Sequence, residues 1–130
     1  MKKTLSILAF FALNATLLAQ TGPKIEFQAK DNTIDYGTIT KQNDNGIRTF
    51  YFKNTGDAPL LISNVQSTCG CTIPSYPKTP ILPGQTNQID IKYNMSPGPM
   101  RKTITVESNA VNYEEGRVPL KIKGTVIIKP

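Results

Sequence analysis

The chain of 130 residues contains no histidine. Without an imidazole, no Ser-His-Asp or Cys-His arrangement can activate a nucleophile. A blue-copper centre and a zincin site each need two histidines, so the sequence excludes both kinds of metal site. We therefore predict that the protein is not an enzyme and holds no cofactor.

Tryptophan is also absent, which excludes the Cys-Trp-Cys core of antibody-type domains. Clustered positive charge is scarce. Subtracting Lys2 and Lys3 from the 15 basic residues leaves 13 against 9 acidic ones, and Arg101 and Lys102 form the one adjacent basic pair beyond the first residues. A nucleic-acid surface needs a basic stripe, so we expect a mixed, solvated surface and no nucleic-acid partner.

Long apolar runs are confined to the start of the chain. Lys2 and Lys3 precede an apolar run over residues 5–18, and the leader ends with L-L-A-Q. This order is typical of a secretory signal peptide, and the run is shorter than the roughly 20 residues of a membrane span. We predict a signal peptide over residues 1–20 and an exported domain over residues 21–130, with no stable membrane anchor after cleavage.

Alternating apolar and polar residues predict short β-strands along the exported part. The clearest strand covers residues 47–54, where Phe50 and Phe52 share one face. Similar alternation occurs at residues 25–27, 34–39, 60–67, 89–93, 103–108 and 118–126, and the last of these is expected to break at Gly124 into a strand pair. Seven or eight short strands without helical periodicity are typical of a two-sheet antiparallel sandwich.

Proline, glycine and asparagine mark the expected connections. Residues 41–46, K-Q-N-D-N-G, have the composition of a hairpin turn, and residues 54–59 are expected to form another turn. Residues 76–83 contain three prolines and cannot pair as a central strand, so we expect an edge or a crossing loop there. Residues 95–100 are predicted to form a proline-glycine loop.

Both cysteines lie in one central stretch, Q-S-T-C-G-C-T-I-P at residues 66–74. Two cysteines in an exported chain most simply form a disulfide with each other. Cys69 and Cys71 are separated by one residue, which places their Cα atoms near the upper limit that a disulfide tolerates. Gly70 permits a sharp local kink that draws the two sulfur atoms together.

The residues beside the cysteines suit a turn. Ser67 and Thr72 can hydrogen-bond to their local backbone, and Pro74 is expected to end the strand pairing. These residue types explain the geometry of the stretch more readily than any chemistry.

Four interpretations of the cysteine pair are open. Cys69 and Cys71 are thiols that shape a turn, a disulfide that pins a local conformation, a redox pair, or part of a copper(I) site with Met95 and Met100 as thioether ligands. A bridge across so short a loop adds little stability, and a strained one is easily reduced. No second cysteine pair exists to complete a four-thiolate site.

The stretch S-T-C-G-C-T-I-P resembles the signature of a bacterial family of exported domains, domain of unknown function 1573, which is common in Bacteroidetes. Further blocks similar to those of the family extend over nearly the whole exported part: D-Y-G-T-I at residues 35–39, F-Y-F-K-N-T-G-D-A-P-L at 50–60, P-I-L-P-G-Q at 80–85 and L-K-I-K-G-T-V at 120–126. The L-L-A-Q ending of the leader is also similar to the leaders of exported Bacteroidetes proteins.

The resemblance implies an immunoglobulin-like sandwich, similar to domains of sperm-protein and pilus-chaperone type, and no established catalytic activity. It marks Cys69, Gly70 and Cys71 without giving them a role. We therefore expect a non-enzymatic envelope module, in the periplasm rather than at the cell surface, that binds a protein or glycan through loops or a free edge strand. The alternative is a periplasmic thiol-redox or copper(I)-handling protein that acts through the C-G-C pair.

Overall fold

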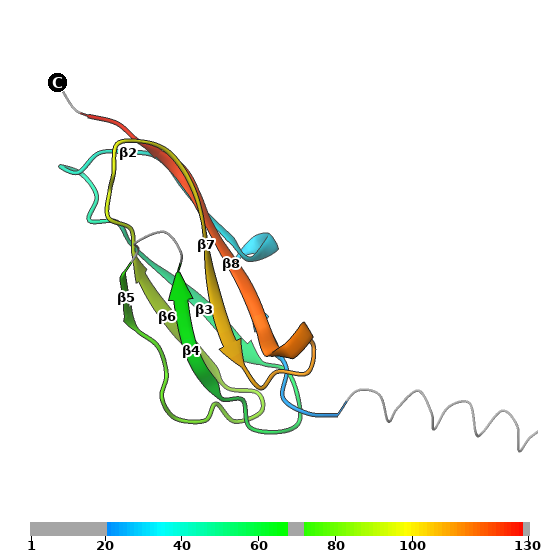
Figure 1. The fold of residues 1–130 in the computed structure, drawn as a ribbon. Helices are drawn as coiled ribbons and strands as arrows, with labels where there is room; N and C mark the ends of the chain where they lie inside the picture. The colour runs from blue at the N-terminus through cyan, green and yellow to red at the C-terminus, as the bar shows by residue number, and fades with distance from the viewer. Residues whose placement is uncertain (1–20, 68–71, 129–130) are drawn as a thin grey trace, which may run out of the picture.

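A computed structural model describes residues 21–67 and 72–128, so the predicted signal peptide and the C-G-C triplet lie outside the described residues. The described chain forms two packed β-sheets with two single-turn 3-10 helices (Figure 1). The strands are β1 (Ile25–Phe27), β2 (Thr33–Ile39), β3 (Ile47–Asn54), β4 (Ile62–Ser67), β5 (Thr72–Ser75), β6 (Thr86–Lys92), β7 (Gly98–Ser108) and β8 (Arg117–Val126), and the 3-10 turns are η1 (Lys30–Asn32) and η2 (Glu114–Gly116). No helix among these residues is long and apolar enough to cross a membrane.

The strand order confirms an all-β sandwich. The first sheet has the order β1-β3-β6-β5 and the second has the order β2-β8-β7-β4. Every pairing between these strands is antiparallel except that of β2 with β8, which is parallel. The prediction of a purely antiparallel sandwich is therefore wrong for this one pair.

The sequence predicts a hairpin turn at residues 41–46, and this prediction is wrong. The parallel pair arises because residues 40–46 form a connection between the two sheets instead. They carry the chain from β2 in the second sheet to β3 in the first. Since β2 and β3 do not pair, β2 lies instead beside β8, which runs in the same direction. A turn composition thus indicates where the chain bends, while the partner of each strand depends on the whole fold.

The core lies between the inward faces of the two sheets. Phe50 and Phe52 are fully buried, as their alternation predicted. The ring of Phe27 on β1 packs edge-on against Phe50 at a centroid distance of 6.2 Å and lies 5.3 Å from the ring of Phe52. Burying an aromatic or aliphatic side chain of this size contributes about 1.5–3 kcal/mol to the free energy of unfolding.

Two predictions about the C-terminal half are wrong. The strand β7 begins at Gly98, so the last part of the expected loop at residues 95–100 is already strand, and Met100 pairs with Gly124. The strand β8 runs through Gly124 without a break. A Cβ atom at Gly124 would lie 2.8 Å from the Cβ of Tyr36, so this glycine allows β2 and β8 to approach each other.

The proline-rich residues 76–83 do not pair as a central strand, as predicted, but they do not cross between the sheets: they belong to the loop that joins β5 to β6, its neighbour in the first sheet. Within it, Ile81 forms an isolated antiparallel bridge with Leu60, with N–H···O distances of 2.9 and 2.8 Å. Both side chains are fully buried. The loop therefore closes one side of the core without joining either sheet.

Asn54, at the end of β3, is the one fully buried polar residue of the described chain. Its Nδ2 donates to the carbonyl oxygens of Ala58 and Ile81, each at 2.8 Å. Its Oδ1 accepts from the backbone N–H of Gly56 at 2.9 Å and of Lys24 at 3.4 Å. One side chain thus joins the N-terminal segment, the turn after β3 and the loop between β5 and β6.

Candidate binding site at one end of the sandwich

Several segments distant in sequence meet at the end of the sandwich where β2, β6 and β8 finish and β3 and β7 begin. They are residues 40–46 between β2 and β3, residues 93–97 between β6 and β7, and Ile127 and Ile128 after β8. Strand β5 begins at this end, because its first residue, Thr72, pairs with Lys92 at the finish of β6. We call it the pocket end.

An ion pair shapes the 40–46 connection. The Asp44 carboxylate accepts two hydrogen bonds from the Arg48 guanidinium, at 2.7 and 3.0 Å, and one from the backbone N–H of Gly46 at 2.8 Å. Hydrogen bonding from Arg48 above all, and then from the Gly46 N–H, lowers the pKa of Asp44. The guanidinium of Arg48 also lies 4.0 Å from the centre of the Tyr36 ring, a cation–π distance.

Tyr36 joins this connection to the following loop. Its hydroxyl donates to the carbonyl oxygen of Gly46 at 2.8 Å, and the same oxygen accepts from the N–H of Tyr93 at 2.9 Å. Burial raises the pKa of Tyr36 to about 12, although the nearby charge of Arg48 opposes the rise. The phenol therefore stays protonated at neutral pH and acts as a hydrogen-bond donor that holds the loop.

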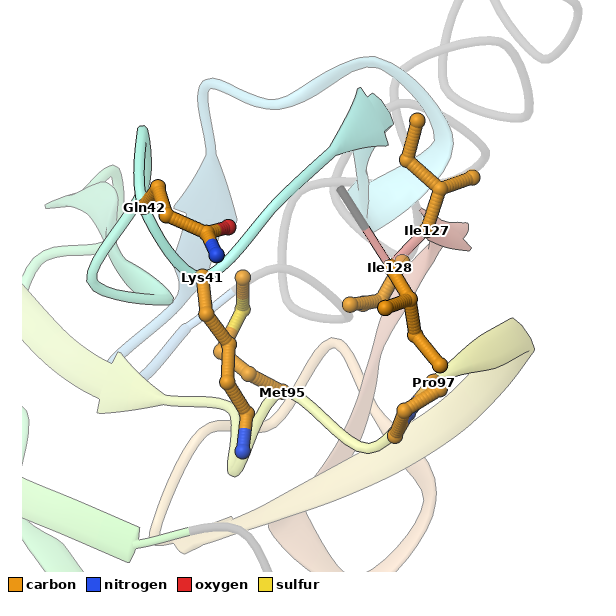
Figure 2. Close-up of a pocket in the computed structure, with 7 residues that line it drawn as sticks. Lys41, Gln42, Met95, Pro97, Ile127 and Ile128 are labelled. Atoms are coloured by element: carbon orange, nitrogen blue, oxygen red, sulfur yellow. The ribbon is translucent and has the colours of Figure 1, made fainter. Parts of the chain in front are cut away.

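Beside this cluster lies a half-open apolar pocket of about 240 Å³. Figure 2 shows Lys41, Gln42 and Met95 on one side and Pro97, Ile127 and Ile128 on the other, and Val126 completes the lining. Ile127 and Ile128 are 46% and 76% exposed, unusually high values for isoleucines in a folded domain. This pocket is the candidate site.

The fold holds both walls of the pocket in place. Ile127 donates its backbone N–H to the carbonyl oxygen of Ile39 at 2.9 Å, which continues the β2–β8 pairing beyond the last strand. On the other wall, Met95 has a left-handed backbone with a φ of 60°. A Cβ atom on Gly46 would lie 3.2 Å from the Met95 Cγ and 2.4 Å from the Tyr93 carbonyl oxygen, so only glycine fits there.

The lining limits what the pocket can do. Its side chains are aliphatic, apart from the thioether of Met95, the amide of Gln42 and the ammonium of Lys41. No carboxylate, hydroxyl or thiol is among them, so the pocket offers no acid–base pair of carboxylates and no Ser- or Cys-type nucleophile. Its chemistry suits the burial of an apolar group with a negative charge close to it.

The structure places the residues around the C-G-C triplet at two sheet edges. Ser67 ends β4 opposite Ile104, and Thr72 begins β5. Pro74 does not end the pairing, because Ser75 still pairs with Asp90 after a shift of register. A proline is tolerated here because β5 is an edge strand with an irregular register.

The predicted copper(I) ligands receive a different role. Met95 and Met100 are 5% and 3% exposed and belong to the hydrophobic core. Cys69, Gly70 and Cys71 lie outside the described residues, so their pairing and redox role stay predictions. Among the described residues, no group of three or more His, Cys, Asp or Glu side chains is placed to hold a metal ion.

Sequence reasoning did not find the pocket, although one indication was present. Val126, Ile127 and Ile128 are consecutive apolar residues that break the alternation of β8. In a two-sheet sandwich such a run exposes at least one apolar side chain. Nothing in the sequence predicts that Lys41 and Gln42 line the pocket. They approach Ile127 and Ile128 only because residues 40–46 connect the two sheets at this end.

Comparison with known proteins gives a family and a fold. The family model described as "Protein of unknown function (DUF1573)" matches residues 27–126. No match is found among curated proteins. The Bacteroidetes origin and the family signature around the cysteines stay predictions.

Solved structures with the same fold come from diverse proteins. A protein of unknown function from Porphyromonas gingivalis W83 has 17% identity and a TM-score of 0.64, over 82% of this chain and 48% of that one. The secreted serine protease VesC from Vibrio cholerae has 17% identity and a TM-score of 0.59, over 79% of this chain and 23% of that one. The ASH/PapD-like domain 7 of human CEP192 has 11% identity and a TM-score of 0.55, over 82% and 87%.

These likenesses concern the fold alone. The chain spans about half the length of the Porphyromonas gingivalis protein and about a quarter of VesC. The PapD-like match supports the immunoglobulin-like class of the sandwich.

Proposed function

Since the chain belongs to the DUF1573 family of proteins of unknown function, we propose that it is a non-enzymatic binding module of the cell envelope. The pocket end is its binding site, and it takes an apolar side chain of a partner protein. The observation that carries this proposal is the pair of exposed isoleucines, Ile127 and Ile128, beside a half-open apolar pocket of about 240 Å³.

The size and lining of the pocket suit one branched or aromatic side chain. Burying such a group is worth about 1.5–3 kcal/mol, and each 1.4 kcal/mol changes an affinity about tenfold. The ammonium of Lys41 favours a partner with a carboxylate next to its apolar residue. Because both walls are held by backbone hydrogen bonds and a buried tyrosine, little ordering cost opposes binding.

Sequence features support the non-enzymatic and envelope parts of the proposal. The chain has no histidine to serve as a base, and its first residues have the composition of a secretory leader. A module of this kind acts in the periplasm.

Site-specific photo-cross-linking tests the pocket. The protein is expressed in its native cells with a benzophenone amino acid at position 128. Irradiation of these cells should give one discrete cross-linked partner. Leu61 is the matched control position, because it is 46% exposed and precedes β4 at the opposite end of the sandwich. The partner captured through position 128 should be absent when the probe is at position 61.

Affinity measurements with the purified partner complete the test. Ile128→Asp should weaken binding about tenfold or more, because it places a charge in the apolar wall, whereas Leu61→Asp should leave the affinity unchanged. Equal losses for both variants, or equal cross-linking from both positions, would contradict the pocket as the binding site.

A further inference from the structure

The outward face of the second sheet carries an excess of positive charge. Along β8, Val118, Leu120 and Ile122 point into the core, so Arg117, Lys121 and Lys123 point outward. On β7, Arg101 lies directly opposite Lys123, and Thr103 lies opposite Lys121. On the other side of β8, the strand β2 places Asp35 beside Lys123 and Thr33 beside Lys121.

Carboxylates of the described residues do not balance these charges. On the strands, four cations point outward, Arg101, Arg117, Lys121 and Lys123, against Asp35 and Glu107. Lys30, Lys102 and the carboxylate of Asp31 also line the hollows of this face, so the excess of positive charge remains. The ion pair found among the described residues is that of Arg48 and Asp44, at the pocket end. The two strand carboxylates accept other hydrogen bonds: Asp35 from the Gly37 N–H at 2.9 Å, and Glu107 from Asn64 and Gln66 at 3.3 and 2.8 Å.

The face is hollowed rather than flat. Three adjacent shallow hollows, of about 390, 510 and 330 Å³, cross the strands β7, β8 and β2. Lys123 lines all three, and Arg101 lines the two larger ones. Thr33, Thr103 and Thr125 stand between the charged side chains along the same hollows.

We propose that this cationic face (Arg101, Lys121 and Lys123, with the threonines between them) binds an acidic polysaccharide, a chain of uronic acid units. Carboxylates of the polymer pair with the lysines and the arginine, and the threonine hydroxyls bond to sugar hydroxyls. Neighbouring strands lie about 4.7–4.9 Å apart and outward residues of one strand about 6.6 Å apart. An extended anionic chain across the hollows therefore meets a cation repeatedly.

The other polyanionic partners fit this face less well. Single-stranded nucleic acid is held by stacking of its bases on aromatic rings, and no aromatic side chain lines the three hollows. A membrane-binding surface inserts apolar side chains between lipids. The large exposed apolar residues of the described chain lie elsewhere, at Ile47, Tyr51, Leu61, Leu82, Val111, Ile127 and Ile128.

Binding of the purified protein to polygalacturonate, measured by titration calorimetry at low salt, tests the proposal. Arg101→Gln with Lys123→Gln should lower the affinity at least about tenfold, and raising the salt from roughly 20 to roughly 200 mM should weaken binding by at least about the same factor. Lys123→Arg keeps the charge and should retain the affinity. Uncharged dextran should not bind.

The matched control removes two charges from the other sheet. Lys53 and Lys92 point outward on β3 and β6, so Lys53→Gln with Lys92→Gln changes the net charge equally and should alter the affinity less than about twofold. An equal loss in this control, or no binding to polygalacturonate at low salt, would overturn the proposal. Equally tight, Lys123-dependent binding to duplex DNA or to anionic phospholipid vesicles would overturn the polysaccharide as the partner.

Discussion

Replacing Asn54 with aspartate tests how strongly one buried amide holds three segments together. The substitution keeps the size of the side chain but exchanges the Nδ2 donor for an oxygen. The carbonyl oxygens of Ala58 and Ile81, each 2.8 Å from Nδ2, then lose this donor and face an acceptor. The two bonds to Oδ1, from Gly56 and Lys24, can remain.

The expected cost follows from these contacts. A buried acceptor that loses its donor costs about 1–3 kcal/mol, so two would cost about 2–6 kcal/mol. Because the Ile81 carbonyl oxygen also accepts from the Leu60 N–H at 2.9 Å, it is not left without a partner. We therefore expect Asn54→Asp to lower the free energy of unfolding by about 2–4 kcal/mol at neutral pH, a large share of the roughly 5–15 kcal/mol of a typical domain.

The loss should depend on pH in a defined direction. Burial and the two carbonyl oxygens disfavour a carboxylate at this position, so folding should raise the pKa of the introduced carboxyl group above its unfolded value of about 3.9. The folded variant then binds more protons than the unfolded variant between these two pKa values. The variant should therefore recover stability, relative to the original protein, as the pH falls from about 7 toward about 4.

Urea unfolding followed by circular dichroism, at several pH values, measures both effects. Asn87→Asp on β6 is the matched control, because Asn87 is exposed and the chemical change is the same. The reasoning would be refuted by a loss below about 1 kcal/mol for Asn54→Asp, or by equal losses for the two variants. A loss that does not shrink at low pH would show that the new carboxyl group reaches solvent.

Three further predictions concern the core, one glycine and the cysteines. Phe50→Ala should cost about 3–5 kcal/mol in urea unfolding, as for other fully buried aromatic residues, and a much smaller loss would mean that this face is not inward. Gly46→Ala and Gly84→Ala both place alanine at a φ near 80°, but only the new Cβ at position 46 would lie 2.4 Å from a carbonyl oxygen. In thermal melts, Gly46→Ala should therefore lower the free energy of unfolding by ~1–3 kcal/mol more than Gly84→Ala does. Mass spectrometry of native protein, with and without alkylation, should show no mixed disulfides on Cys69 or Cys71, whereas trapped partners or retained copper would favour the redox or copper-handling alternative.

Much of the local structure was predictable from the sequence. Alternation placed β3 and the inward faces of Phe50 and Phe52 correctly, because burial of one sheet face imposes a period of two on the residues. The same pattern does not report which strands pair, so the β2–β8 pairing was missed. Gly124 was misread as a break because a glycine in a strand can mark either a break or a close approach of another strand.

The candidate site was less accessible to sequence reasoning. Lys41, Met95 and Ile128 all line the pocket. They become neighbours because residues 40–46 connect the two sheets and because residues 127–128 continue in line with β8. The cationic face likewise follows from the register that sets Arg101 opposite Lys123. In both cases, the residues become neighbours only through long-range pairing, which local composition does not encode.

The pairing of β2 with β8 also governs the order in which the domain can assemble. Thr33 and Lys121 are partners although 121 − 33 = 88 residues separate them, and the Asn112 side chain exchanges two hydrogen bonds with the Ile25 backbone across 87 residues. Such distant contacts slow folding, because a long loop must close before they form. Strand β2 can therefore pair only once β8 is available, whereas β1 pairs with β3, which is much nearer in the sequence. Deleting β8 would thus also leave β2 without its pairing partner.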